Sequence, residues 1–436
     1  MRLRVLFSAI LFSFLVFPFA EAKVFGAKEF ILDNGLRLIV VENNKAPLAA
    51  QFLCYHVGRI DEPKGKSGLA HLLEHMMFKG TGFSEAIDRL GGSDNAFTTN
   101  DMTCYHQRVA SRYLETVMAM EANRMRRLSF SESDFADEKK VVIEERVERT
   151  DSRPEGAFRE NSARIFYEDS PYAVPTIGFM DEIKSLTSGN IKSFYQMHYI
   201  PKNAVLAISG DIDAITVKRW ADKYYGTIKK RDYQTSHPVP DKDYGVHKYT
   251  QELRMKHGNV SRPQLTLRFH APSFFTPGVD LKNIYALDVF AESTGGSIIG
   301  KLYQKLVVDE KLLISVSASY SPYSRLSSEF VVSAIPADGY DREKIVLRIL
   351  AVLNEDLTSK EIDRVRDRMK IDMTYLAEKP LSGAEVIAPI AVNGVPLDEV
   401  ENYIEHLYAF STDELNRYKK ELLKYPFVGW LEQTND

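Results

Sequence analysis

His71-Leu72-Leu73-Glu74-His75 is the most informative stretch of this 436-residue chain. If the stretch is helical, residues three and four apart share a face, so His71, Glu74 and His75 converge while the two leucines point elsewhere. Two imidazoles one turn apart can hold one Zn²⁺, and a carboxylate beside them can act as a general base. The stretch therefore predicts a metallohydrolase site written in the inverted order H-x-x-E-H.

The flanks of the motif separate it from a chance match, which in most helices would lie on a solvated face. They are apolar and are bounded by Gly68 on one side and Gly80 on the other, which predicts a short buried helix. Two histidines and a glutamate buried among Leu, Met and Phe would be costly without a partner. A cation is the obvious partner.

Zinc needs a third protein ligand and an open position. The best candidates lie in residues 137–148, an acidic segment of good helix formers. Glu138 and Glu145 lie on one stripe of that helix, whereas Glu144 is rotated by about 100° from Glu145. Periodicity alone does not distinguish this segment from a charged surface helix.

The motif, its flanks and the acidic helix resemble the pitrilysin/mitochondrial processing peptidase family of zinc endopeptidases, the inverzincins. Glu145 follows His75 by 70 residues and Glu138 by seven, which matches the spacing in that family. The resemblance implies that His71, His75 and Glu145 bind one zinc ion per chain. It also implies that Glu74 is the catalytic general base and that Glu138 orients a ligand or the water.

Residues 91–105 resemble the substrate-edge strand of the same family. There the substrate backbone adds as an extra strand, so the resemblance implies that Asn95, Ala96 and Phe97 bind substrate. Without the resemblance, this segment would be a turn and an ordinary strand. Residues 199–211 also match the family's Y-x-P-x-N-hydrophobic-G-D strand.

The resemblance implies an α+β fold of two similar α/β-sandwich halves, each an antiparallel-rich sheet covered by helices, which together form a clamshell. Roughly 410 residues exceed a single hydrophobic core, which agrees with two lobes. We expect a signal peptide at 1–22, an N-terminal zinc-binding half at 23–228, a linker at 229–245 and an inactive homologous half at 246–436.

The second half departs from the family pattern. After Leu302-Tyr303-Gln304-Lys305-Leu306, many family members have an Arg and, seven residues later, a Tyr that hold substrate over the zinc. This chain has Val307 and Ile314 there, and a buried aliphatic pair cannot grip a peptide carbonyl. The resemblance therefore implies a partner, either a homologous subunit without the zinc motif or a second copy of this chain.

The first 22 residues have the pattern of a secretory signal. Arg2 and Arg4 precede an apolar stretch, and Ala20-Glu21-Ala22 is an A-x-A cleavage site. An uncleaved anchor is the alternative. We expect a periplasmic or secreted protein with no membrane span after cleavage. Loss of this leader changes the formal charge from −4 to −5, which argues against a nucleic-acid partner.

Cys54 and Cys104, the two cysteines of the chain, both fall in predicted strands. They are either two buried thiols or one disulfide formed in an oxidising space. We favour two buried thiols.

These features predict a zinc endopeptidase that hydrolyses peptides or unfolded segments outside the cytoplasm, as the metal-bearing subunit of a hetero-oligomer. The alternative is a non-catalytic peptide-binding or structural subunit that keeps the fold. The intact set of His71, Glu74, His75 and Glu145 argues against that alternative.

Overall fold

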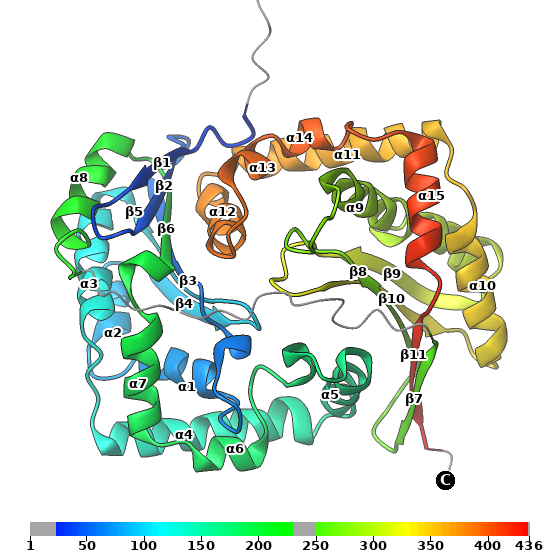
Figure 1. Ribbon diagram of the computed structural model, residues 1–436, viewed down its shortest axis with the longest axis horizontal. Coiled ribbons are helices and arrows are strands. Elements are labelled where there is room, and N and C mark those ends of the chain that lie inside the picture. The colour runs from blue at the N-terminus through cyan, green and yellow to red at the C-terminus, as the bar shows by residue number, and fades with distance from the viewer. Residues whose placement is uncertain (1–22, 230–248, 435–436) are drawn as a thin grey trace, which may run out of the picture.

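The computed structural model describes residues 23–229 and 249–434 (Figure 1), which are called the first half and the second half below. The predicted signal peptide, 1–22, lies outside the described residues. The same holds for the predicted linker 229–245 except its first residue.

Each half contains one sheet. The first sheet has six strands in the order β1-β2-β6-β3-β5-β4, and β2 and β6 form its one parallel pair. Its strands are β1 (Lys28–Ile31), β2 (Arg37–Glu42), β3 (Leu48–Tyr55), β4 (Ser93–Thr98), β5 (Thr103–Ala110) and β6 (Ala204–Gly210). The strand predicted to bind substrate, β4, forms one edge of this sheet.

The second sheet has five strands in the order β7-β11-β8-β10-β9, with β7 and β11 parallel. Its strands are β7 (Gln251–His257), β8 (Gln264–Ala271), β9 (Leu313–Tyr320), β10 (Ser328–Pro336) and β11 (Phe427–Gln433). Two antiparallel-rich sheets with helices confirm the predicted α+β class and the two similar halves.

Helices and short helical turns connect these strands. In the first half they are η1 (Arg59–Asp61), α1 (Leu69–Met76), α2 (Phe83–Arg89), η2 (Ser111–Tyr113), α3 (Leu114–Arg126), α4 (Glu132–Arg146), η3 (Val147–Asp151), α5 (Pro154–Tyr167), η4 (Pro171–Ala173), α6 (Met180–Ser185), α7 (Ser188–His198), η5 (Pro201–Asn203) and α8 (Ala214–Tyr224). In the second half they are α9 (Leu281–Gly295), η6 (Tyr303–Asp309), α10 (Arg342–Asn354), α11 (Ser359–Glu378), α12 (Ser382–Val392), α13 (Leu397–Glu401), α14 (Tyr403–His406) and α15 (Thr412–Leu422).

Both faces of the first sheet are covered. On one face, Leu38 and Leu53 pack with Leu72 of α1. On the other face lies α12, which belongs to the second half (Figure 1) and packs Ile387 against Phe52. This double cover explains why β3 and β6 are buried along nearly their whole length. A division of the chain at the linker therefore does not separate the two cores completely.

The second sheet buries one face. Along β8, Leu265, Leu267 and Phe269 enter the core of the second half, while Thr266 and Arg268 alternate with them on the other face. That face lies toward α5 of the first half (Figure 1).

Cys54 and Cys104 form a disulfide, so the expectation of two buried thiols is wrong. The register of β3 and β5 places the two residues directly opposite each other. Both are fully buried, in the core that α12 covers. A sequence shows that each cysteine lies on a strand, but it does not show the register of the two strands.

The expectation that Val307 and Ile314 form a buried pair is wrong for Ile314. Val307 packs against the core of the second half, but Ile314 is 43% exposed. The side chain belongs to β9, the edge strand of the second sheet, and alternates there with buried Leu313.

Within the described residues, no helix combines the length and apolar character needed to cross a bilayer.

A buried polar cluster joins the two halves. Asp101 accepts a hydrogen bond from the Tyr172 hydroxyl at 2.6 Å through its side chain, and one from Arg325 at 3.1 Å through its carbonyl oxygen. Arg325 also pairs with Asp61, and the negative charge of Asp61 adds to the effect of burial on the pKa of Asp101. Burial raises the pKa of Asp101 to about 6, although Tyr172 and Arg325 oppose that shift.

This raised pKa predicts a pH-dependent stability. The folded state holds the Asp101 proton more tightly than the unfolded chain, so this contribution is complete below about pH 4 and is lost as the pH rises through about 6. Asp101→Asn should remove up to about 3 kcal/mol of the difference in unfolding free energy between pH 4 and pH 7. Urea unfolding at several pH values, with zinc removed from every sample, measures the free energy of unfolding of the wild type and the variant. Parallel wild-type and variant profiles would contradict the assignment.

Candidate metal centre

The motif helix α1 is fixed at its N-terminus by the carboxylate of Glu62. Glu62 accepts hydrogen bonds from the backbone N–H groups of Gly68 at 3.1 Å and Ala70 at 2.7 Å. Gly68 has φ = 85°, and a Cβ there would lie 2.5 Å from the Ile177 carbonyl oxygen, so only glycine fits. Leu72 and its apolar neighbours anchor the opposite side of α1 in the core.

Three predicted zinc ligands come together between α1 and α4. The Glu145 Oε2 lies 3.7 Å from His71 Nε2 and 3.3 Å from His75 Nε2. One donor atom from each of the three residues lies within 4.8 Å of the others. Zinc bonds of about 2.0–2.2 Å would place neighbouring tetrahedral donors about 3.3–3.6 Å apart. The donor set and its spacing therefore fit a zinc ion with three protein ligands.

Two further side chains contact these predicted ligands. Glu138 Oε1 lies 2.8 Å from His75 Nδ1, and its other oxygen is paired with Lys79 Nζ at 2.5 Å. Arg149 NH1 lies 2.7 Å from Glu145 Oε1, one turn further along the chain. Carboxylates that bond the second nitrogen of a ligating histidine fix the orientation of its ring. The structure places Glu138 beside His75, on the ring nitrogen that faces away from Glu145.

The charges around the two histidines are unequal. Burial, together with the smaller effect of the neighbouring His75, lowers the pKa of His71 to about 4. Burial also disfavours the charged form of His75, but its hydrogen bonds with Glu138 and Glu145 outweigh burial and raise the pKa of His75 to about 9. Of the two histidines, His75 therefore holds a proton more tightly, because it lies between the carboxylates of Glu138 and Glu145.

Glu74 lies on α1 between the two histidines of the motif and is buried. Its Oε2 accepts a hydrogen bond of 2.6 Å from the hydroxyl of Thr98, the last residue of β4. Burial raises the pKa of Glu74, and the bond from Thr98 opposes this shift. The predicted general base is thus tied to the edge strand.

The three residues predicted to bind substrate lie on β4 but face different ways. Ala96 packs against the core that contains α1. Phe97 packs on the opposite face of the sheet, against the core that contains the disulfide. Asn95 is exposed, and its Oδ1 accepts a hydrogen bond from the Ala96 N–H at 2.8 Å. Ala96 is therefore the one of the three that shares a face of β4 with Thr98.

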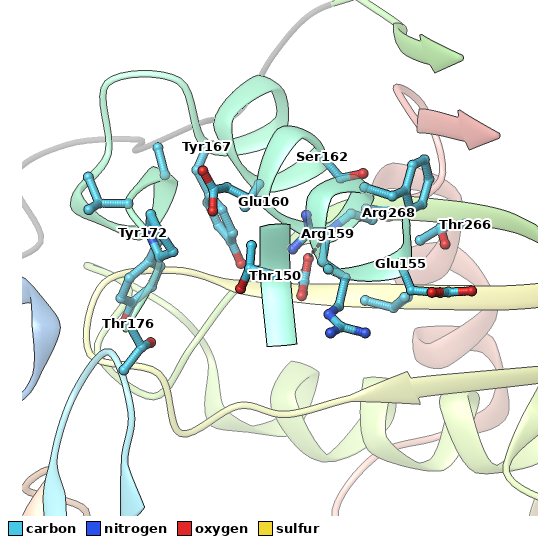
Figure 2. Close-up of a pocket in the computed structure, with 18 of the residues that line it drawn as sticks. Thr150, Glu155, Arg159, Glu160, Ser162, Tyr167, Tyr172, Thr176, Thr266 and Arg268 are labelled. Carbon is cyan, nitrogen blue, oxygen red and sulfur yellow. Dashed lines mark hydrogen bonds and ion pairs between the residues drawn. The ribbon is translucent and has the colours of Figure 1, made fainter. Parts of the chain in front are cut away.

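A cavity of about 670 Å³ lies between the halves, and none of the three predicted zinc ligands lines it. Figure 2 shows polar side chains of α5, among them Glu155 and Ser162, together with Thr266 and Arg268 of β8. Thr150, which follows Arg149 in the chain, lines the same cavity. The cavity is therefore separate from the candidate metal centre, although one of its lining residues lies only five positions after Glu145 in the chain.

Comparison with known proteins agrees with this geometry. Residues 38–178 match the family described as insulinase (peptidase family M16), and residues 185–369 match the peptidase M16 inactive domain. The chain belongs to the peptidase M16 family. This confirms the resemblance to the inverted-motif zinc peptidases that the sequence indicated.

M16 relatives from bacteria share most of the chain. It is 28% identical over 407 residues to a protein named zinc protease PqqE from Helicobacter pylori, covering 90% of this chain and 89% of that protein. The crystal structure of a protease from H. pylori superposes with a TM-score of 0.85 at 27% identity, over 93% of this chain and 99% of that one.

The periplasmic protease PqqL from Escherichia coli has the same fold over part of its length. It superposes with a TM-score of 0.77 at 18% identity, and the match covers 94% of this chain but 48% of PqqL. This M16 chain therefore corresponds in fold to about half of that larger protein.

The structure adds two residues to the M16 site that sequence reasoning missed. Glu62 falls in the stretch before the motif helix, and an acidic residue near a helix start could have marked it. Thr98 belongs to a strand 24 residues beyond Glu74 in the sequence, so no local pattern links the two.

Proposed function

We propose that this chain is a zinc-dependent endopeptidase that hydrolyses peptides or unfolded polypeptide segments outside the cytoplasm, as the metal-bearing subunit of a hetero-oligomer. One observation carries the proposal: donor atoms of His71, His75 and Glu145 lie within 4.8 Å of one another, and Glu74 stands beside them on α1. Relatives named zinc proteases support zinc as the metal.

In the proposed hydrolysis of a peptide, each residue of the site has a separate role. When bound by His71, His75 and Glu145, zinc polarises a carbonyl and lowers the pKa of water. Glu74 takes a proton from the attacking water at Oε1 and passes it to the leaving amine. Thr98 holds the other oxygen of Glu74, which fixes the direction in which the carboxylate points.

Thr98→Val tests this role of the hydroxyl. Valine keeps the shape of threonine but cannot donate to Glu74, so we expect kcat to fall by about tenfold or more with KM little changed. Thr98→Ser keeps the hydroxyl and should retain most of the activity. Steady-state kinetics on one peptide with both variants checks this, and equal kcat values for the two would contradict it.

The edge strand β4 explains why the substrate should be a peptide or an unfolded segment. In the first sheet β4 pairs with β5 on one side only. An extended chain could add to its other side through main-chain hydrogen bonds, with Asn95, Ala96 and Phe97 nearest to it. A folded protein does not offer a free extended segment, so it would be excluded.

The disulfide and the leader support activity outside the cytoplasm. Disulfides persist in oxidising compartments, and Cys54–Cys104 is a buried one. The predicted signal peptide at 1–22 agrees with this, as does the periplasmic PqqL among proteins of similar fold.

Two observations support a partner subunit. Val307 and Ile314 cannot replace the Arg and Tyr that the family resemblance places over the substrate. The chain also corresponds to 48% of PqqL, which leaves the rest of that architecture to be supplied by another chain. A homologous subunit without the zinc motif would supply the missing half. A second copy of this chain, in a homodimer, is the simpler alternative.

The partner has a measurable consequence. We expect the isolated chain to cleave peptides at least about tenfold more slowly than the assembly purified from its native host, because a substrate held on one side only is poorly positioned. Light scattering of the native assembly should show a mass above 49.6 kDa, which is the mass of one full 436-residue chain. Mass spectrometry should identify the second chain. A monomer as active as the native preparation would contradict the partner.

A non-catalytic peptide-binding subunit is the rival function, and one experiment separates the two. The purified, zinc-loaded protein is incubated with a peptide mixture, and cleavage and binding are both measured by mass spectrometry. Cleavage that a chelator abolishes supports the endopeptidase. Binding without cleavage, in the native assembly as well as in the isolated chain, supports the rival.

A further inference from the structure

One guanidinium group from the second half is buried inside the first. Arg325, between β9 and β10, donates to the Asp61 carboxylate at 2.8 and 3.1 Å and to the Asp101 carbonyl oxygen at 3.1 Å. The Arg325 side chain is 4% exposed and that of Asp61 is 1% exposed. Such a two-pronged pair fixes geometry more strictly than a single ionic contact does.

The next residue of the second half reaches the same place. The Leu326 N–H donates to the Tyr172 hydroxyl at 3.0 Å, and that hydroxyl donates to the Asp101 carboxylate at 2.6 Å. Tyr172 and Leu326 are both buried. Two consecutive residues of the second half are therefore fixed on the turn that contains Asp101.

The Asp61 side of this contact leads to the motif helix. Asp61 ends η1, and Glu62 immediately after it holds the first N–H groups of α1. Asp61 also accepts a hydrogen bond from the Gly58 N–H at 2.9 Å, which closes η1 on itself. A shift of Asp61 would therefore move Glu62 and the first turns of α1, where His71 lies.

The Asp101 side leads to the edge strand. Residues 99–102 form the turn between β4 and β5, and Thr98 just before it holds Glu74. The turn also accepts hydrogen bonds from η1, from Arg59 N–H at 3.1 Å and from Ile60 N–H at 2.9 Å. Arg325 therefore binds two segments that contact each other: η1, which leads to α1, and the turn after β4, which leads to Thr98.

We propose that Arg325 is a positioning residue through which the second half sets the placement of α1 relative to β4. Its effect on turnover rests on the proposed peptidase function, but its effect on the two segments does not. The role gives the second half a part in the site even though Val307 and Ile314 stand where the family clamp would be. Glu74 and the peptide-binding edge would then be aligned only when the two halves are docked.

Three variants test this. Arg325→Met removes the guanidinium but keeps the length of the side chain, and Arg325→Lys keeps the charge but cannot form the two-pronged contact. Arg348→Met is the matched control, because Arg348 also belongs to the second half but pairs with Glu310 at a more exposed site. Zinc content, amide hydrogen exchange, kcat and KM are measured for each purified protein.

We expect Arg325→Met to keep one zinc and to speed exchange in segments 58–62 and 99–103, with β8 and β10 unchanged. Its kcat should fall by about 10-fold to 100-fold, more than KM changes, since small misplacements of reacting groups carry such losses. Arg325→Lys should lie between Arg325→Met and wild type, and Arg348→Met should match wild type.

Two results would overturn the role. Wild-type exchange in both segments of Arg325→Met would show that the guanidinium does not hold them. If exchange in Arg325→Met speeds up equally in both sheets, Arg325 stabilises the contact between the halves in general and has no specific role at the two segments. Hydrogen exchange needs no substrate. If the chain has no peptidase activity, the proposed function is wrong, but the exchange data still show whether Arg325 holds the two segments.

Discussion

Replacing Glu74 with glutamine should leave one zinc bound and lower kcat by about 10³-fold. Glutamine keeps the shape of the side chain and can still accept the hydrogen bond from the Thr98 hydroxyl. It cannot take a proton from water, and this step is the one assigned to Glu74. Zinc content by elemental analysis and turnover of a single peptide are the two measurements.

Glu144→Gln is the matched control for this change. Glu144 is an exposed carboxylate near the site but not part of it, so the variant should behave as wild type. If Glu74→Gln lost its zinc, Glu74 would be a ligand or a structural element. If it kept full turnover, another group would be the base.

Glu145→Ala should remove zinc from the protein. Glu145 Oε2 lies within 3.7 Å of a nitrogen of each histidine, and two histidines alone leave the ion one protein ligand short. We expect affinity for zinc to fall by more than about 100-fold, since even groups that only orient a ligand contribute 10-fold to 100-fold. Competition with a chelator of known affinity measures the change.

Glu144→Ala separates this effect from a general loss of charge on α4. The two glutamates are adjacent, but their side chains point about 100° apart around the helix. The control should bind zinc as wild type does. Equal affinities for Glu145→Ala and Glu144→Ala would exclude Glu145 as a ligand.

The sequence was sufficient to predict the parts of the site that repeat along one helix. His71, Glu74 and His75 share a face because of helical periodicity alone, and the structure brings them together as expected. Choosing Glu145 over Glu144 needed the family spacing, because periodicity does not say which face of α4 meets α1.

The parts that could not be predicted depend on contacts between distant segments. The Cys54–Cys104 disulfide follows from the register of β3 and β5, and the cover of α12 on the first sheet joins segments more than 300 residues apart. The bond between Thr98 and Glu74 and the reach of Arg325 into the first half are of the same kind. None of these contacts leaves a local pattern in the chain.

The most direct test of the central claim is peptide cleavage under control of the metal. The native assembly is purified, stripped of metal with a chelator, reloaded with one equivalent of zinc per chain and given a mixture of unstructured peptides at each stage. We predict cleavage before stripping, none after it, and recovery on reloading, while the Glu74→Gln assembly stays inactive throughout. Cleavage that persists without metal, or a zinc-loaded assembly that binds the peptides and leaves them intact, would contradict the claim.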